Sequence, residues 1–306
     1  METAPPLVTV LLPTCNRRDF LAAAIGSIRD QTFRDWKLLV LNDGGEDVSD
    51  VVAGFGDPRI EYHALPHRGK AAALNAGLAL VRSKYVSYMD DDDLVYPDHL
   101  TELVALAERE GAEFAYSDTW AVHVGPDGRE IRRRIENDAD VRFDDIRLFN
   151  RINHKQILHT KRLADEAGPY DERLRILIDY DYIRRLAHLA TPVHLRKTTG
   201  EHFLRQTSED ENGIASITGL WVSDPAAAGR SIAAVFEKDP AALTEIYLRA
   251  NRYAPTCEAL AQARDSLRNA GKRIETIERS LSYRLGMALT APLRWIAELL
   301  RRPRKN

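Results

Sequence analysis

Continuous apolar runs in the first part of the chain predict buried β-strands. A strand covered on one face alternates apolar and polar residues, whereas a strand covered on both faces is apolar throughout. Such runs are Leu7–Leu12, Lys37–Leu41, Tyr85–Met89 and Phe114–Ser117, with Ile60–His63 as a shorter candidate. The sequence Asn42-Asp43-Gly44-Gly45 after the second run is a strong turn signal. We therefore expect several short strands at the centre of a sheet.

The segments between these runs have the residue spacing of helices. In Phe20–Ile28 the apolar residues share one helical face. Lys70–Val81 is rich in Ala and Leu, and Pro97–Glu110 has a proline near its start, where a helix tolerates it. Alternating strands and helices predict an α/β fold, with a mixed, mainly parallel, Rossmann-like sheet covered by helices on both faces.

The pattern changes after Ser117. Trp120–Val124 and Arg129–Arg132 flank a Gly-Pro-Asp-Gly sequence and predict a hairpin or a loop turn. Further expected elements are helices over 142–151, 160–167 and 178–189, a polar loop over 207–213 and a helical region to about 252. The expected division is a domain over 1–206, with halves 7–117 and 118–206, a helical region over 207–255 and a helical tail over 256–306.

A weak seven-residue repeat lies near the C-terminus. Leu260, Leu267, Ile274 and Leu281 recur at this interval. The repeat favours a homo-oligomer formed through a 260–281 helix. A helix packed on its own domain explains the same spacing equally well.

Composition restricts the classes of function. The chain has 306 residues, of which 44% are hydrophobic and 29% charged, as in ordinary globular proteins. A net charge of −3 argues against a nucleic-acid partner. The cysteines, Cys15 and Cys257, form no disulfide framework, which favours a reducing compartment. Without a signal-peptide pattern or an apolar run of roughly 18 residues, the expected location is cytoplasmic.

Four consecutive aspartates, Asp90–Asp93, follow the run Tyr85–Met89. Crowded carboxylates repel one another and favour a cation or several hydrogen-bond donors. Hard divalent ions such as Mg²⁺ and Mn²⁺ prefer oxygen ligands and leave room for phosphates. Ligands also tend to bind at the carboxyl ends of strands in α/β sheets. An isolated cluster of this kind is nevertheless more often a solvated acidic turn.

Two common phosphate-binding sequences are absent. Gly69-Lys70 lacks the preceding glycine of a P-loop, and no Gly-x-Gly-x-x-Gly follows the first strand. A carboxylate at a strand end can instead contact a base or a ribose, and Asp43 occupies such a position. Ordinary turn chemistry explains Asp43 equally well.

Short motifs along residues 7–206 together resemble those of family-2 glycosyltransferases with the GT-A fold. They are Val8–Arg17, Ser27–Phe33, Val40–Gly45, Ala72–Gly77, Tyr88–Asp93, His159–Arg162, Gly168–Asp171 and Asp179–Arg185. The first resembles the family's Pro-Thr-Tyr-Asn-Arg turn, and the fifth its Asp-x-Asp segment. Each motif is weak alone. Their common order and spacing favour the resemblance over the solvated turn.

The resemblance implies which residues meet a nucleotide-sugar donor. They are Pro13, Thr14, Asn16, Asp43, Arg68, Lys70, Asn75, Asp90 and Asp91. Asp43 would contact the base, with a UDP-sugar as the favoured donor. Asp90 or Asp91 would meet the ribose, and Asp92, with Asp90, would hold Mg²⁺ or Mn²⁺ on the diphosphate. Arg68 or Lys70 would add positive charge near the phosphates, although a solvated helix start explains them equally well.

The resemblance also implies a catalytic base, Asp179. The acceptor hydroxyl must lose its proton as it attacks, which needs a carboxylate within hydrogen-bond reach. A metal ion neutralises the departing diphosphate, and a single displacement inverts the anomeric centre. His159 and Asp181 would lie on the acceptor side. A surface carboxylate paired with Arg184 or Arg185 is the structural alternative for Asp179.

Two positions depart from the family pattern. Cys15 stands where the family usually has Tyr, which weakens stacking on the base. Ile178 stands where Glu often precedes the catalytic carboxylate, so Asp179 would act alone or with Asp181. His202 is a candidate for an additional metal ligand, although a lone histidine more often has a structural role.

The C-terminal tail lies outside the family motifs. Residues 281–300 are rich in aliphatic and aromatic side chains, and a basic cluster follows at 301–305. This composition favours peripheral contact with the inner face of an anionic cell membrane. Packing on the domain or on a partner subunit is an equal alternative.

The sequence therefore predicts a metal-dependent, inverting glycosyltransferase that acts on a glycan or lipid-linked acceptor in surface polysaccharide or glycolipid synthesis. A nucleotidyltransferase of similar layout is an alternative, disfavoured by the missing glycine-rich loop. A non-catalytic, nucleotide-sugar-binding scaffold is another, kept open by the departures at Cys15 and Ile178.

Overall fold

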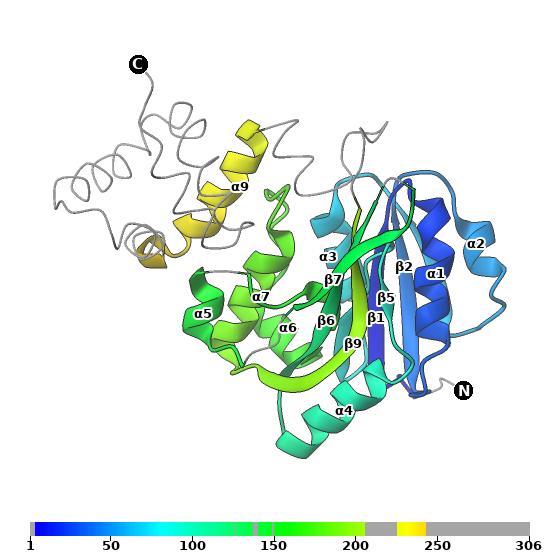
Figure 1. Cartoon of the computed structure of the whole chain (residues 1–306), viewed down its shortest axis with the longest axis horizontal. Helices are drawn as coiled ribbons and strands as arrows, with labels where there is room; N and C mark the ends of the chain where they lie inside the picture. Colours follow the sequence, from blue (N-terminus) through cyan, green and yellow to red (C-terminus); the bar gives the residue numbers. More distant parts are fainter. Residues whose placement is uncertain (1–3, 126, 137–139, 149, 206–224, 243–306) are drawn as a thin grey trace. The chain divides into compact units, whose positions relative to one another are not determined.

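A computed structural model describes residues 4–125, 127–136, 140–148, 150–205 and 225–242 (Figure 1). These residues form two units. The first takes 4–146, 151–172 and 178–205, and the second takes 147–148, 150, 173–177 and 225–242. The heptad-like repeat, the 207–213 segment and the basic tail lie outside the described residues.

Within the described residues, nine strands form one mixed sheet in the first unit. The strands are β1 (Val8–Thr14), β2 (Trp36–Asp43), β3 (Ile60–Leu65), β4 (Tyr85–Tyr88), β5 (Leu94–Val95), β6 (Phe114–Val124), β7 (Glu130–Glu136), β8 (Ile157–Thr160) and β9 (Val193–Arg205). Their order is β3-β2-β1-β4-β8-β6-β9-β5, and β7 pairs with β6. The sheet therefore joins two sequence halves through β4 and β8.

The helices follow the predicted positions closely. They are α1 (Arg18–Arg29), α2 (Ser49–Ala53), α3 (Lys70–Leu80), α4 (His99–Glu110), α5 (Phe143–Leu148), the 3₁₀ helix η1 (His154–Gln156), α6 (Lys161–Ala167), α7 (Ile178–Leu189) and α9 (Pro225–Glu237). The helix expected over 142–151 ends at Leu148. No helix in the described ranges has the length and apolarity to cross a bilayer.

Strands β3, β2, β1 and β4 run parallel, as the apolar runs predict. In register, Thr14 at the end of β1 lies beside Asn42 of β2, and Leu11 lies beside Tyr88 at the end of β4. Parallel strands end at the same edge, so the polar residues after β1, β2 and β4 gather there.

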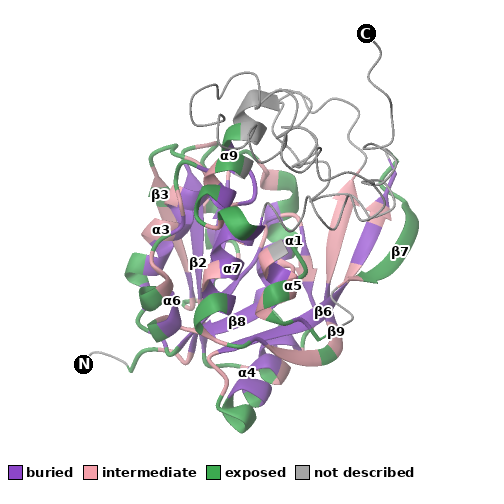
Figure 2. Ribbon diagram, turned by 90° about the vertical axis from the view of Figure 1, so that its left-hand side faces the viewer, coloured by how far each residue is buried: buried purple, intermediate pink, exposed green. Residues whose placement is uncertain are grey.

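Helices cover both faces of this parallel half. On one face Val10 and Val40 pack with the apolar sides of α1, α2 and α4. On the other, Leu11 and Leu41 pack with α3, α6 and α7. Figure 2 shows the resulting buried centre, with exposed residues on the outer helix faces, on the loops and on β7. Burial on both sides explains why the strands read as unbroken apolar runs.

Gly77 allows α3 to approach the sheet closely. A Cβ at this position would lie 2.6 Å from Leu41 Cδ1 and 3.0 Å from Leu11 Cδ2. A larger residue would have to displace these leucine side chains or move α3 away from β1 and β2.

The second half of the sheet differs from a simple parallel pattern. The predicted hairpin is confirmed, because β6 and β7 pair antiparallel across the Gly125–Gly128 turn. Strand β8 lies antiparallel between β4 and β6, and β9 runs parallel to β6. Neither β8 nor β9 was expected from the sequence. β8 is only four residues long, and β9 (VHLRKTTGEHFLR) has no continuous apolar run.

A buried polar cluster holds β9 against its neighbours. Thr199 Oγ1 lies 2.7 Å from His99 Nδ1 on α4 and donates to Gln156 Oε1 at 2.8 Å. Ser117 of β6 also donates to Gln156 Oε1, at 2.6 Å. Because these groups are withdrawn from water, their mutual hydrogen bonds fix the position of β9.

The second unit contains its own polar contacts. The Ser231 hydroxyl of α9 accepts a hydrogen bond from the backbone N–H of Arg175, at 2.9 Å. Arg147 lies 3.3 Å from Asp239. The first contact ties α9 to the 173–177 segment, and the second ties Arg147 to the residues that follow α9, all within the same unit.

Three core histidines are held neutral by burial. His99, His154 and His159 are at most 2% exposed. Burial lowers the pKa of His99 and of His154 to about 3, and that of His159 to about 4. These three histidines are therefore neutral in the folded core near neutral pH.

Stability should fall as the pH falls from about 6.5 toward 4. The folded pKa of His99 is about 3 and the ordinary value is 6.5, so between these values the unfolded chain binds a proton that the folded chain does not. Each such histidine contributes a slope of up to about 1.4 kcal/mol per pH unit. Denaturant unfolding across this range measures it. In His99→Gln, the slope of unfolding free energy against pH should fall by the share of one proton. An unchanged slope would contradict a neutral His99 in the folded core.

Candidate functional site

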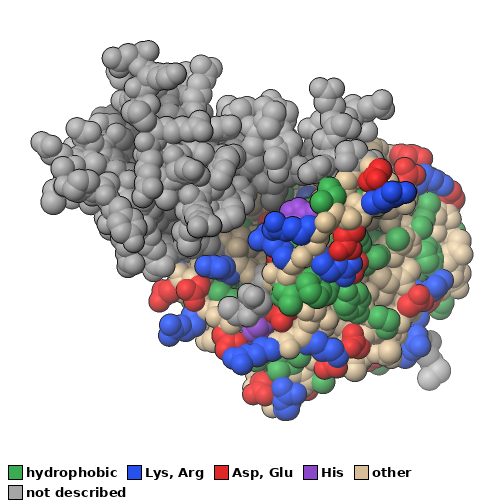
Figure 3. All heavy atoms as spheres, in the orientation of Figure 1, with side chains coloured by type: hydrophobic (Ala, Val, Ile, Leu, Met, Phe, Trp, Pro, Cys, Tyr) green, Lys and Arg blue, Asp and Glu red, His purple; other side chains and the backbone are tan. Residues whose placement is uncertain are grey.

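The predicted site residues meet at the carboxyl edge of the parallel strands. Thr14 ends β1, Asp43 ends β2, and Asp90–Asp93 follow β4. Figure 3 shows acidic, basic and histidine side chains gathered in the upper middle of the face it displays. The edge is therefore rich in charges of both signs.

The four aspartates alternate in exposure. Asp91 and Asp93 are buried, at 6% and 2% exposed. The side chains of Asp90 and Asp92 keep 27% and 24% of their surface. Asp91 accepts a hydrogen bond from the Thr14 hydroxyl at 2.8 Å. Asp90 and Asp92 are thus the members of the run available to a ligand.

Cations from three separate elements contact these carboxylates. Lys70, the first residue of α3, lies 2.5 Å from Asp90 Oδ1. Arg17, just before α1, lies 2.7 Å from Asp92 Oδ2. Arg205, the last residue of β9, lies 3.5 Å from Asp92 Oδ2 and donates to the Asp92 carbonyl oxygen at 3.0 Å.

Burial disfavours the charged forms of Asp91 and Asp92 despite the neighbouring Arg17. Burial raises the pKa of Asp91 to about 6; Arg17 opposes the shift, and Asp92 adds to it. Burial and the neighbouring Asp93 likewise raise the pKa of Asp92. For Asp90, burial is outweighed by the charge of Lys70, and the pKa falls. Carboxylates with raised pKa values favour an added cation.

This donor set fits a hard divalent ion. Mg²⁺ and Mn²⁺ are commonly held by one or two carboxylates together with substrate phosphates. Asp92 and Asp90 supply such oxygens on the accessible side of the run. The residues present therefore fit the metal expected from the sequence.

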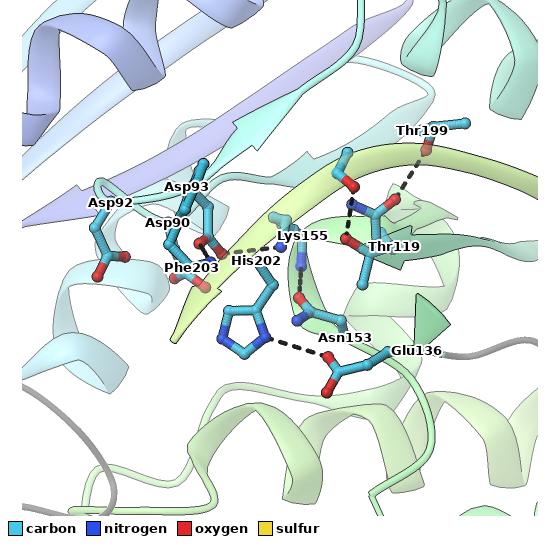
Figure 4. Close-up of polar contacts among 12 residues, drawn as sticks. Asp90, Asp92, Asp93, Thr119, Glu136, Asn153, Lys155, Thr199, His202 and Phe203 are labelled. Atoms are coloured by element: carbon cyan, nitrogen blue, oxygen red, sulfur yellow. Dashed lines mark hydrogen bonds and ion pairs between the residues drawn. The ribbon is translucent and has the colours of Figure 1, made fainter. Parts of the chain in front are cut away.

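Asp93 forms a buried ion pair with Lys155 of η1 (Figure 4). Lys155 Nζ lies 2.9 Å from Asp93 Oδ2, and the two side chains are 0% and 2% exposed. Asp93 Oδ1 also accepts the backbone N–H of Phe203, on β9, at 2.9 Å. One carboxylate thereby connects the end of β4 with η1 and β9.

Asp43 is held by the loop that leads into α3. Its carboxylate accepts the backbone N–H of Arg68 at 2.8 Å and that of Gly69 at 2.9 Å. The side chain is 6% exposed. Gly69 has φ 100°, a conformation that favours glycine. Asp43 therefore has a structural role, because it positions the start of α3 and with it Lys70.

Other predicted donor residues lie in the same region with structural contacts of their own. Pro13 is buried within β1 beside Leu41. The side-chain oxygen of Asn16 accepts the backbone N–H of Glu46 at 2.8 Å. Asn75 bonds both backbone polar groups of Tyr170, at 2.7 and 3.0 Å. These contacts shape the loops around the edge.

Arg68 points toward the 168–172 segment. Its guanidinium lies 2.6 Å from Glu172, which also accepts from the Asn75 amide at 3.0 Å. Of the two cations expected near the phosphates, Lys70 contacts the aspartates and Arg68 contacts Glu172.

Asp179 and Asp181 have different surroundings on α7. Asp179 is half-buried in the first turn. Burial tends to lower the pKa of Lys70, but the negative charges of Asp90 and Asp179 have the larger effect and raise it. Asp179 is therefore close enough to Lys70 to influence the electrostatics of the site. Asp181 is 1% exposed and pairs with Arg185 at 3.1 Å. Arg185 in turn donates to the Gly168 carbonyl, which gives Asp181 a structural contact.

The two histidines of interest also differ. His159 is fully buried in β8, with Nε2 2.8 Å from the Tyr88 hydroxyl and Nδ1 2.9 Å from the Thr160 carbonyl. Both ring nitrogens are engaged in the core, so His159 presents none to an acceptor. His202 lies near the aspartates in Figure 4, with Nδ1 3.2 Å from Glu136. Burial disfavours its protonation, but Asp93 and Glu136 raise its pKa.

Sequence reasoning assigned no role to Arg17, Lys155 or Arg205. Arg17 stands in the matched Asn-Arg turn, which was a usable signal. Lys155 sits in a short polar stretch beside Ile157 and gave no sign of burial. Arg205 ends a strand that the sequence did not predict.

The Asp93–Lys155 pair should make a large contribution to stability. Removing one partner by Lys155→Met or Asp93→Asn leaves a buried charge unpaired, at a cost of about 3–5 kcal/mol. The double variant should cost clearly less than the sum of the single variants. Denaturant unfolding of all four proteins measures this coupling, and additive effects would contradict the pair.

An exposed pair of the same type serves as the control. Lys197 lies 2.6 Å from Asp98, with side chains 41% and 39% exposed. Because water screens this pair, Lys197→Met and Asp98→Asn should each cost under about 1 kcal/mol.

The model of glycosyl transferase family 2 matches residues 9–166. The match covers just over half of the chain and includes the strand ends, the aspartates and the Lys155 segment.

Curated relatives are similar to a little under 60% of the chain. Succinoglycan biosynthesis protein ExoO of Rhizobium meliloti is 30% identical over 189 residues, which are 57% of this chain and 54% of that protein. The PGL/p-HBAD biosynthesis glycosyltransferase Rv2957 of Mycobacterium tuberculosis is 29% identical, over 58% of this chain and 69% of that protein. An uncharacterized glycosyltransferase of Rickettsia typhi is 27% identical, and the chain spans 58% of its length. The match thus spans little more than half of some relatives.

Solved structures share the fold. The mannosyltransferase PcManGT from Pyrobaculum calidifontis, in complex with GDP-Man and Mn²⁺, has a TM-score of 0.58 at 14% identity, covering 98% of this chain and 89% of that one. S. aureus TarS 1-349 in complex with UDP-GlcNAc has a TM-score of 0.57 at 14% identity, covering 92% and 79%. These likenesses confirm the expected GT-A fold.

Proposed function

The chain belongs to glycosyl transferase family 2, and on this basis we propose that it is an inverting, metal-dependent enzyme that transfers a sugar from a UDP-sugar to an acceptor hydroxyl. The observation that carries the proposal is the convergence of Asp43, Lys70 and Asp90–Asp92 at one sheet edge. Two solved structures of the same fold have a UDP or UDP-GlcNAc ligand, and another has GDP-Man, which supports a nucleotide-sugar donor.

The donor is proposed to lie along the carboxyl ends of β1, β2 and β4. Asp43 receives the base, with Pro13, Thr14, Asn16 and Asn75 around the pocket. Of the two aspartates expected at the ribose, the partly exposed Asp90 is proposed to meet it, because Asp91 is buried against Thr14. Arg17 and Lys70 already lie against the aspartates, where they can donate to phosphate oxygens in place of their present carboxylate contacts. Arg68 is paired with Glu172 and is proposed to contribute less than Lys70 to phosphate binding.

Asp92, with Asp90, is proposed to hold Mg²⁺ or Mn²⁺. The ion supplies Lewis-acid neutralisation of the departing diphosphate. The Mn²⁺ in the PcManGT complex supports a metal in this fold. Asp92 is suited to the task because burial and Asp93 raise its pKa, so an added cation relieves a charge that the protein solvates poorly.

Asp179 is proposed as the base that takes the acceptor proton. It stands at the start of α7, half-buried and within the electrostatic reach of Lys70. Since Asp181 pairs with Arg185 and His159 is sealed in the core, Asp179 is the better placed acceptor-side candidate.

The acceptor is proposed to be a glycan or a lipid-linked glycan. ExoO is named for succinoglycan biosynthesis and Rv2957 for PGL/p-HBAD biosynthesis, which supports a role in surface polysaccharide or glycolipid assembly. Such a role suits action in the cytoplasm or at the inner face of the cell membrane. The tail expected to contact lipid and the 260–281 segment expected to self-associate lie outside the described residues.

Asp179→Asn should abolish transfer while leaving donor binding intact. Loss of a general base costs about 10²–10⁴-fold in turnover, whereas the donor contacts come from other residues. The measurement is release of nucleoside diphosphate from a panel of nucleotide sugars, alongside donor affinity by calorimetry. Turnover within threefold of wild type would contradict the assignment.

Asp181→Asn is the matched control on the same helix. Because Asp181 pairs with Arg185 in the protein interior, this change should lower the unfolding free energy. Turnover per folded molecule should stay close to wild type. A loss of turnover confined to Asp181→Asn would instead make Asp181 the base.

A further inference from the structure

A second group of side chains of the metal-ligand type lies at the same sheet edge as the aspartates. Cys15, Asp43 and His67 each offer one ligand atom, and these atoms lie within 4.8 Å of one another. Cys15 follows the end of β1, Asp43 ends β2, and His67 lies in the loop before α3. None of the carboxylates proposed for Mg²⁺ or Mn²⁺ belongs to this group.

The separations approach those of a tetrahedral site. Cys15 Sγ lies 3.9 Å from His67 Nδ1, and His67 Nδ1 lies 3.1 Å from Asp43 Oδ2. Zinc bonds of ordinary length at tetrahedral angles place ligand atoms about 3.5 Å apart. A shift of a few tenths of an ångström in the exposed His67 ring would bring its nitrogen to both other ligands.

The chemistry of the three ligands selects a different class of ion from the aspartates. Thiolate and imidazole suit Zn²⁺ and similar borderline ions, whereas Mg²⁺ and Mn²⁺ prefer an all-oxygen set. We propose that Cys15, Asp43 and His67 form a Zn²⁺ site that is separate from the catalytic metal at Asp90 and Asp92.

Asp43 is already oriented for this task. The backbone N–H groups of Arg68 and Gly69 hold its two carboxylate oxygens, so the side chain cannot turn away. Outer hydrogen bonds of this kind fix a ligand before the metal arrives. Gly44 lets His67 lie close, since a Cβ there would meet the His67 backbone nitrogen at 2.4 Å.

Coordination requires two proton movements. The Cys15 thiol releases its proton to solvent as the sulfur–metal bond forms; burial, with Asp43 and Asp91, raises the pKa of this thiol, so the metal-free form is protonated. His67 Nδ1 lies 2.8 Å from the Asp43 carbonyl oxygen, to which it donates in its Nδ1-protonated form. On binding, the ring proton resides on Nε2 and Nδ1 becomes the ligand.

The site would compete with the donor. This consequence rests on the proposed function, in which Asp43 receives the base and Cys15 stands where related enzymes carry Tyr. An ion bonded to Asp43 and Cys15 occupies the position of the base. Zn²⁺ should therefore inhibit by displacing the nucleotide, while Mn²⁺ at Asp92 supports its binding.

Cobalt substitution tests the site directly. Co²⁺ added to the purified full chain should give the intense near-ultraviolet band of a cobalt–thiolate bond, and Zn²⁺ should remove it. Cys15→Ser should abolish the band and weaken Zn²⁺ binding by at least about 100-fold, since loss of outer partners alone costs 10- to 100-fold. Cys257→Ser, which removes the other cysteine, should leave both unchanged.

The outcomes separate the two proposals. An absent band, or a band lost in Cys257→Ser and kept in Cys15→Ser, overturns the zinc site. Calorimetry with UDP and Mn²⁺ then measures the competition: Zn²⁺ should lower UDP affinity at least tenfold in wild type and have little effect in Cys15→Ser. A normal cobalt band with no UDP binding at all would retain the zinc site and refute the proposed donor. Circular dichroism of each variant establishes that it is folded.

Discussion

The buried ion pair between Asp93 and Lys155 is the constraint on which the geometry of this site depends. Two opposite charges without access to water must stay in contact, because separating them would expose each to the low-dielectric interior. Asp93 follows β4, Lys155 lies in η1, and Phe203 of β9 donates to the same carboxylate. The pair thus joins the parallel half of the sheet to β9, a strand that the sequence did not predict.

The aspartates that precede Asp93 in sequence alternate in burial. With Asp93 turned inward, Asp92 faces the edge and Asp91 turns inward again toward Thr14. With Phe203 bound to Asp93, Arg205 two residues later reaches Asp92 and stacks on Phe20, with its guanidinium carbon 4.2 Å from the ring centre. The buried pair thus lies beside the ion pairs of Asp90 with Lys70 and of Asp92 with Arg17, whose cations are proposed to bind the donor phosphates.

Local patterns predicted the parallel half of the fold, because its strands are apolar on both faces and its helices are amphipathic. The apolar runs ending near Thr14, Asp43 and Asp90 also indicated that these residues share one edge. β9 could not be predicted in this way. Its polar residues are satisfied by distant partners, such as Thr199 by His99 and Gln156, and no local pattern encodes a partner far along the chain.

The same limit applies within the site. Neighbours in sequence, Asp90 to Asp93, could be recognised as a cluster, but which of them face a ligand depends on Thr14, Lys70 and Lys155. Likewise, the replacement of Tyr by Cys15 was visible, whereas its closeness to His67 was not, since the two lie 52 residues apart.

The most direct measurement is calorimetric binding of UDP, GDP, CDP and dTDP, each with and without Mn²⁺, to the wild type and to Asp92→Asn, with Asp165→Asn as an exposed control. Our account predicts Mn²⁺-dependent binding of UDP that weakens at least about tenfold in Asp92→Asn alone. If the folded wild type binds none of these nucleotides, or binds UDP equally well without Mn²⁺ and without Asp92, the assignment of this edge as a metal-dependent nucleotide-sugar site is wrong.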